Sequence, residues 1–128
     1  MLEESPIIIQ NTHSAVTLLN DNIFLVEYIR DHEIEIDDFE ETRNAYHYLS
    51  KNKRLKFLVV FPDFVSVTPE ARKWAEEHQV DTEAEAIVFK SLAQRIIIKF
   101  YLTFRKQQHP GKIFTSKEKA IHWLNSMP

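Results

Sequence analysis

The chain contains no cysteine and only one glycine in 128 residues. Without cysteine it can form neither a disulfide nor a thiolate nucleophile, which fits the reducing environment of the cytoplasm. With one glycine it lacks the glycine-rich loops that hold phosphates in nucleotide-binding domains, and the GxSxG motif of serine hydrolases is missing as well. We therefore expect no enzyme, no catalytic residues and no bound cofactor.

A strong charge of one sign is also missing. The formal net charge is −3, with acidic and basic residues interspersed, so a nucleic-acid partner is not expected. The acidic start MLEESP is not followed by a signal-like apolar block. The most apolar predicted helix, Leu92–Phe104, carries Arg95 and Lys99 and is too short to cross a bilayer. We expect a cytoplasmic protein without a transmembrane segment.

Apolar residues are plentiful, at 44% of the chain, and 12% of the residues are aromatic. A chain of this length and composition can bury a real core, and we expect one domain over residues 1–128. The segment HSAVTLLNDNIFLVEYI predicts two strands joined by a turn at residues 20–22. The segment EIDDFEETRNAYHYLSKN predicts a helix that Asp37 or Asp38 caps.

The run LKFLVVF, Leu55–Phe61, predicts a central strand that is buried on both faces. Alternation along it places Leu58 and Val60 on one face of the sheet and Phe57, Val59 and Phe61 on the other. Both sets are expected to be buried.

The second half of the chain alternates helices and strands. Thr68-Pro69-Glu70 begins a helix, AEAIVF and GKIFT are strands around the Leu92–Phe104 helix, and Thr115 caps the last helix with Glu118 in a capping box. A strand hairpin followed by this alternation predicts an α/β domain with a mixed sheet of about five strands flanked by helices.

Three segments carry a family resemblance, namely LKFLVVFPDFVSVTPEARKWA, AEAIVFKSLAQRIIIKFYLTF and KIFTSKEKAIHWL. They resemble the SpoIIAA-like branch of the STAS and SEC14-type domain families. The resemblance spans His13 to Leu124 and implies a single-domain SpoIIAA-like (STAS-like) fold. Anti-sigma-factor antagonists of the STAS family carry a phosphorylatable serine in a DSSGL-type motif, whereas the corresponding place here reads PDFVSVTPEA.

Three residues of that segment, Asp63, Ser66 and Thr68, form a candidate anion or phosphorylation site at the start of a helix. A helix N-terminus offers free amides and partial positive charge, which suit a phosphate. The simpler interpretation is that Thr68 only caps the helix, Ser66 is a loop residue and Asp63 a solvated loop acid. The six histidines show no HExxH or other tight ligand spacing, so no metal site is expected.

The Leu92–Phe104 helix has apolar residues around most of its circumference. One core-facing side needs an arc of only about 100°. The excess predicts a second contact through Ile98, Tyr101 and Leu102, either a homodimer seam or an apolar groove, although deep burial in the same chain would also explain it. Two functions follow: a non-catalytic protein-interaction or regulatory module of STAS type, or a small carrier or sensor of a hydrophobic, lipid-like ligand.

Overall fold

The structure is a computed structural model that describes residues 8–89 and 110–127. Its helices and strands, in chain order, are β1 (Ile9–Gln10), β2 (Ser14–Leu19), β3 (Ile23–Tyr28), β4 (Glu33–Ile34), α1 (Ile36–Ser50), β5 (Leu55–Phe61), β6 (Ser66–Val67), α2 (Pro69–Glu77), β7 (Thr82–Phe89), β8 (Gly111–Phe114) and α4 (Lys117–Asn125).

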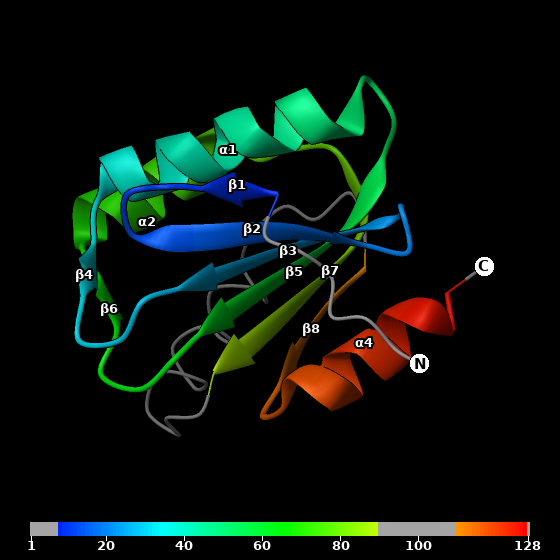
Figure 1. Cartoon of the computed structure of the whole chain (residues 1–128). Coiled ribbons are helices and arrows are strands. Elements are labelled where there is room, and N and C mark those ends of the chain that lie inside the picture. The colour runs from blue at the N-terminus through cyan, green and yellow to red at the C-terminus, as the bar shows by residue number, and fades with distance from the viewer. Residues whose placement is uncertain (1–7, 90–109, 128) are drawn as a thin grey trace.

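The main sheet of the described chain has six strands in the order β1-β2-β3-β5-β7-β8 (Figure 1). The first three strands pair antiparallel, and β3, β5, β7 and β8 pair in parallel. The predicted mixed α/β sheet is thus confirmed. The strand beyond the expected five is β1, a two-residue edge strand in which Ile9 pairs with Val16.

The predicted hairpin is formed by β2 and β3. Asn20 and Asp21 take left-handed backbone angles, with φ of 52° and 60°, and the Asn22 amide donates to the Leu19 carbonyl over 3.0 Å. Two consecutive left-handed residues match the twist of the flanking strands, and asparagine and aspartate tolerate that conformation well. The turn therefore fixes the register that places Val16 opposite Val26.

Strand β5 lies between β3 and β7, as its apolar run predicts. Its two sets of side chains pack into different clusters on the two faces of the sheet, Leu58 and Val60 on one face and Phe57, Val59 and Phe61 on the other. Each residue of both sets is buried or half-buried. The central-strand prediction is confirmed.

Helices cover both faces of the sheet. Helices α1 and α2 lie side by side on one face, and α4 lies on the opposite face (Figure 1). Under α1 and α2 the core is aromatic, with Phe61 stacked on Phe89 at 4.4 Å between ring centroids. Under α4 it is built from smaller residues, among them Ala84, Ala86 and Ala120, so that helix can approach the sheet closely.

The start of α1 differs from the prediction. The N-cap is Glu35, and Asp38 lies in the first turn, where its carboxylate accepts the Glu35 amide over 2.9 Å. The prediction that Asp37 or Asp38 is the cap is therefore wrong. An acid at this third helical position can reach back to the cap amide, which leaves its second oxygen free for other donors.

Of the N-caps predicted for the two other described helices, one is confirmed and one is wrong. Thr68 caps α2 as expected, because its hydroxyl accepts the Ala71 amide over 3.0 Å. Helix α4 is capped by Ser116, which accepts the Lys119 amide over 3.1 Å, and not by Thr115. The sequence has two adjacent hydroxyls, Thr115 and Ser116, and the helix begins after Ser116, so the Ser116 hydroxyl is the one that reaches the Lys119 amide.

A second, two-stranded sheet joins the loops that follow β3 and β5. Strand β4 pairs in parallel with β6, with the Ser66 amide donating to the His32 carbonyl at 3.2 Å and the Thr68 amide to the Ile34 carbonyl at 3.0 Å. This small sheet fixes the starts of α1 and α2 relative to each other.

One predicted element, the apolar helix Leu92–Phe104, lies outside the described residues. Among the helices of the described segments, none is long and apolar enough to cross a membrane.

Candidate functional site

The three residues of the predicted anion site lie in one segment at the carboxyl edge of the parallel strands. The Thr68 hydroxyl caps α2, Ser66 is an exposed residue of β6, and Asp63 is an exposed loop residue whose carbonyl accepts the Asp31 amide. The capping role of Thr68 is confirmed. Binding or attachment of a phosphate at Ser66 or Thr68 stays a prediction. The predicted second contact through Ile98, Tyr101 and Leu102 lies outside the described residues.

A cavity of about 140 Å³ lies between the sheet and the helices α1 and α2. Its wall is mostly apolar, with side chains from β5, β7 and both helices, including Phe57, Val59, Ile87, Phe39, Trp74 and Ala75. On the α2 side the indole of Trp74 stacks on the His78 ring at 4.3 Å, and the His78 Nδ1 hydrogen-bonds the Trp74 carbonyl. These contacts hold the indole in place at the cavity wall.

Two polar atoms on this wall are buried and have no hydrogen-bond partner within the described chain. They are Nε of Arg43, on α1, and Oγ1 of Thr82, at the start of β7. Thr82 is 1% exposed. A buried polar group without a partner costs about 1–3 kcal/mol, so these two atoms are the part of the cavity with the most to gain from a bound molecule.

The other hydroxyls on the wall are already used. Tyr28 donates to Thr42 over 2.5 Å, because the Thr42 hydroxyl itself donates to the Asp38 carbonyl. Burial raises the pKa of the Tyr28 phenol far above its ordinary value, against the opposing effect of the Thr42 hydrogen bond. Tyr28 therefore stays neutral, and its ring is a fixed part of the cavity wall.

These side chains determine what the cavity can bind. It can surround a small apolar body, and it can donate hydrogen bonds from the Arg43 guanidinium and the Thr82 hydroxyl to an acceptor on that body. Arg72 and Glu85 also line the cavity, so a second positive charge is accompanied by one negative charge. The combination suits a small apolar molecule with one anionic group.

Sequence reasoning missed Arg43 and Thr82. A signal for Arg43 did exist, because it lies four residues after Phe39 and three before Tyr46, and so on the core-facing side of the helix. An arginine in that row has to find a partner, be solvated through a cavity, or stay unpaired. Thr82 gave no comparable signal, since a threonine at the start of a strand is ordinary.

A third group of side chains, His13, His32 and Asp38, also meets at the carboxyl edge of the parallel strands. These residues are spread over three separate segments of the chain, so no motif spacing could have revealed them. They are the described residues that could hold a metal ion.

Comparisons with known proteins agree with this architecture. A family model described as a domain of unknown function, DUF7793, matches residues 17–128. The chain belongs to the DUF7793 family. None of the curated proteins matches its sequence.

Solved structures place the fold of this DUF7793 member. A protein of the DUF3478 family from Shewanella loihica PV-4, described as having a SpoIIAA-like fold, superposes with a TM-score of 0.61 at 15% identity, covering 91% of this chain and 98% of that one. A protein with unknown function from Arthrobacter sp. FB24 is 23% identical over 88% of this chain and 99% of its own, with a TM-score of 0.33. The first of these confirms the SpoIIAA-like α/β fold that the sequence motifs predict.

Proposed function

We propose that this domain is a non-catalytic binding module that takes a small apolar carboxylate into the cavity between the sheet and helices α1 and α2. The observation that carries this proposal is the pair of buried, unpartnered polar atoms, Arg43 Nε and Thr82 Oγ1, on a mostly apolar wall. A carboxylate is acceptor-only when ionised, so each of these donors can give it a hydrogen bond. The proposal develops the carrier or sensor of a hydrophobic ligand that the sequence predicts.

The size of the cavity limits the ligand. A cavity of about 150 Å³ in an engineered protein stays dry and binds benzene, and the volume here is about 140 Å³. A ligand of this size has a body comparable to one aromatic ring or a short branched chain. Benzoate and isovalerate fit this description.

The side chains on the wall favour binding over catalysis. Nucleophilic catalysis needs a hydroxyl or thiol in contact with a base. In the described part of the wall the hydroxyls of Tyr28 and Thr42 are bonded to each other, and the imidazole of His78 is bonded to a carbonyl of its own helix. The Thr82 hydroxyl has no hydrogen-bond partner among the described residues, so no base from this part of the chain contacts it. We accordingly assign the domain no reaction.

The test is a titration of the ¹⁵N-labelled protein with benzoate, with benzyl alcohol as the uncharged counterpart, followed by amide chemical shifts. We expect shifts centred on the middle of α1, on α2 and on the start of β7, and weaker binding of the alcohol. Arg43→Met should weaken benzoate binding about 10- to 100-fold, because it removes a charge-assisted hydrogen bond. Arg30→Met, at an exposed arginine that lies over Phe64, is the matched control.

Thr82→Val separates binding from stability. It replaces an unsatisfied buried hydroxyl by a methyl group, so it should raise the free energy of unfolding by about 1 kcal/mol while weakening benzoate binding. Thr115→Val, at an exposed threonine, should change neither. Equal affinities in the wild type and Arg43→Met, or no binding by benzoate, isovalerate and phenylacetate alike, would count against the proposal.

A protein partner is the second candidate, favoured by a strained and exposed aromatic residue at the carboxyl edge. Phe64 is 74% exposed and has a φ of 61°, which is unusual for a bulky residue. Strained backbone persists where function requires it. Phe64→Gly should leave the free energy of unfolding equal or higher. Proteins that are cross-linked to the wild type in its source cells should no longer be cross-linked to this variant.

Self-association through Ile98, Tyr101 and Leu102 remains a prediction from the sequence alone. It rests on the wide apolar arc of the Leu92–Phe104 segment. Sedimentation velocity of the wild type and of Ile98→Lys/Leu102→Lys tests it. A monomeric wild type, or a double variant whose far-UV circular dichroism shows that it has unfolded, would remove the homodimer from consideration.

A further inference from the structure

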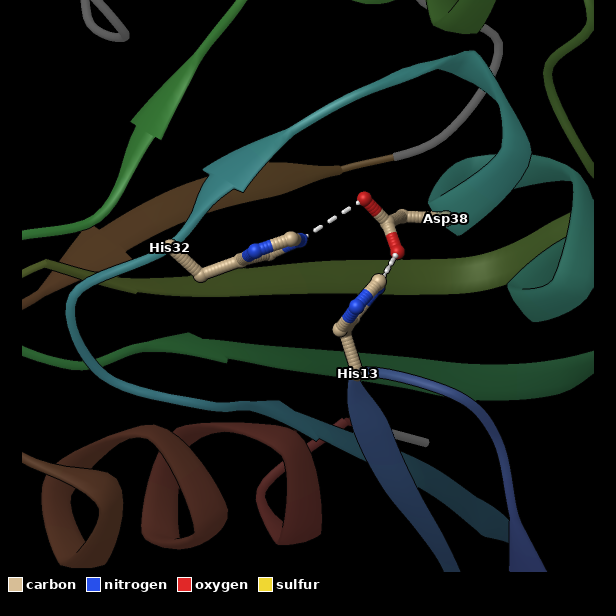
Figure 2. Close-up of side chains that lie close together, drawn as sticks. All are labelled: His13, His32 and Asp38. Atoms are coloured by element: carbon tan, nitrogen blue, oxygen red, sulfur yellow. Dashed lines mark hydrogen bonds and ion pairs between the residues drawn. The ribbon is translucent and has the colours of Figure 1, made fainter.

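Two histidines converge on one buried carboxylate at the carboxyl edge of the sheet (Figure 2). His13 immediately precedes β2, His32 lies in the loop between β3 and β4, and Asp38 is in the first turn of α1. Asp38 is 5% exposed, whereas His13 is 37% and His32 16% exposed. The cluster is thus closed on the carboxylate side and open to solvent beside His13.

Each carboxylate oxygen serves a different imidazole. Asp38 Oδ1 is 2.6 Å from His13 Nδ1, and Asp38 Oδ2 is 2.9 Å from His32 Nε2. The Glu35 amide donates to Oδ2 as well. An ionised carboxylate only accepts, so in this state the protons are on His13 Nδ1 and His32 Nε2. For a metal ion to replace these two hydrogen bonds, each proton has to leave the ring or move to its other nitrogen.

Asp38 is held in its ionised form. Burial by itself would raise the pKa of the carboxyl, but the hydrogen bonds from the Glu35 amide, His32 and His13 outweigh it and lower the pKa below the ordinary value.

We propose that His13 Nδ1, His32 Nε2 and the Asp38 carboxylate form a binding site for a first-row divalent metal ion of the Zn²⁺ type. Two imidazoles and one carboxylate are the ligand set of open, three-ligand sites for such ions, in which water or a further molecule takes the remaining position. The solvent-exposed side of His13 gives that position access.

The cluster is close to the geometry that such an ion needs. All three ligand atoms lie within 4.8 Å of one another. Ligands about 2.1 Å from a tetrahedral ion are about 3.4 Å apart. The two N···O contacts of 2.6 and 2.9 Å, which go to different oxygens of Asp38, therefore have to open by less than about 1 Å, and the widest pair of ligand atoms has to close by at most about 1.4 Å. The imidazole rings, with centroids 4.0 Å apart and tilted by 31°, are already side by side.

The charges around the cluster also favour a cation. The positive end of α1 opposes one, but the segment from Asp31 to Glu41 contains seven carboxylates in eleven residues. One of these, Glu41, is held next to the cluster by two hydrogen bonds to Thr12, from its hydroxyl at 2.9 Å and its amide at 3.3 Å. Coulomb attraction from these groups offsets the helix dipole.

The proposal is tested with the metal alone. Metal-free protein is titrated with Zn²⁺ by calorimetry and with Co²⁺ by visible absorption, which reports the geometry of the ligands. We expect one ion per chain and the strong absorption of a four- or five-coordinate Co²⁺ site. His13→Asn and His32→Gln should each weaken Zn²⁺ binding by at least about 100-fold, since removing a ligand costs more than disturbing its surroundings, which costs about 10- to 100-fold.

Matched controls use histidines outside the cluster. His47→Asn and His122→Asn replace exposed histidines on α1 and α4 and should leave the titration unchanged. His13→Asn is the primary variant, because His13 is the most exposed of the three residues. Replacing His13 leaves the start of α1 intact, whereas replacing Asp38 would remove the bond to the Glu35 amide. Far-UV circular dichroism confirms that each variant is folded.

The outcomes are distinct. Stoichiometric binding that is lost in both cluster variants and kept in both controls supports the site. Binding that survives in His13→Asn and His32→Gln, or that falls in the controls, assigns the ion to scattered surface histidines and overturns the proposal. The absence of binding by the folded wild type also overturns it, and leaves the cluster as a hydrogen-bonded anchor for α1.

Discussion

The hydroxyl of Thr68 accepts the Ala71 amide, and this contact is enough to explain the sequence Thr-Pro-Glu at the start of α2. An unpaired amide in a first helical turn needs either water or a cap. Because the hydroxyl already fills this role, an anion would have to use the remaining amides and the side chain of Ser66.

Thr68→Ala is therefore expected to lower the free energy of unfolding by about 1 kcal/mol, the usual cost of losing an N-cap. Urea denaturation measures it. Ser66→Ala, at an exposed neighbour, should cost less than about 0.5 kcal/mol. If instead Thr68→Ala left stability unchanged and abolished binding of inorganic phosphate, the anion-site interpretation would be the better one.

Asp38 makes stability depend on pH. Its pKa is lowered in the folded chain, so the unfolded chain binds a proton more readily. The resulting stabilisation is complete above the ordinary carboxyl pKa near 3.8 and is lost as the pH falls through the lowered value in the folded state. The difference in unfolding free energy between the wild type and Asp38→Asn should be largest near neutrality and shrink in acid.

Urea denaturation between pH 7 and pH 3 follows that difference. The matched control is Asp37→Asn, which removes the same charge from an exposed position on the same helical turn. A difference for Asp38→Asn that stays constant across this pH range would show that the hydrogen bonds to Asp38 do not depend on its charge.

At the scale of elements, α4 offers two candidate caps next to each other. Ser116→Ala should cost about 1 kcal/mol, because it frees the Lys119 amide. Thr115→Ala should cost less than about 0.5 kcal/mol. Thermal or urea denaturation of the two variants compares them directly, and the reverse order of effects would restore the capping box of Thr115 and Glu118.

Elements with a strong local pattern were predictable. The run Leu55–Phe61 coincides with β5, and the turn at Asn20 and Asp21 lies where its residue types indicate. Caps were harder, because neighbouring polar residues offer equal hydrogen-bonding chemistry and only backbone geometry decides between them. Strand β1 was missed, since two residues are too short a run to show a pattern.

The sites were less predictable than the elements. Thr68 was assigned a cap correctly because capping is local. His13, His32 and Asp38 are brought together by the hairpin and the first crossover, and the cavity polar atoms come from α1 and β7. Such groups depend on tertiary packing, which a single sequence specifies only through the whole fold.

At the scale of the whole molecule, the described residues form two hydrophobic clusters on opposite faces of the main sheet, with a tryptophan on each side. Trp74 lies on α2, and Trp123 lies on α4 against Phe114. Leu58 and Val59 are neighbours in β5 and contribute to different clusters. Because both clusters depend on this strand, the loss of either one disrupts the support of the other. We expect the two sides to unfold together.

Single-tryptophan variants test this cooperativity. Fluorescence of Trp123→Phe reports the α2 side, and fluorescence of Trp74→Phe reports the α4 side. Urea unfolding of each variant is followed by fluorescence and by circular dichroism. We expect the two signals to give the same urea midpoint in both variants. A separate, earlier transition on one side would show that the sheet does not couple the two clusters.

The pairing of β4 with β6 ties the loop that contains His32 to the loop that begins α2, through amides that can be followed one at a time. Exchange of the Ser66 and Thr68 amide hydrogens with solvent requires opening of their bonds to His32 and Ile34. A ligand that immobilises His32 should slow the exchange of these two amides even though they lie in a different crossover. Hydrogen exchange with and without Zn²⁺ measures this, and unchanged rates at both amides would show that the two loops open independently of what His32 contacts.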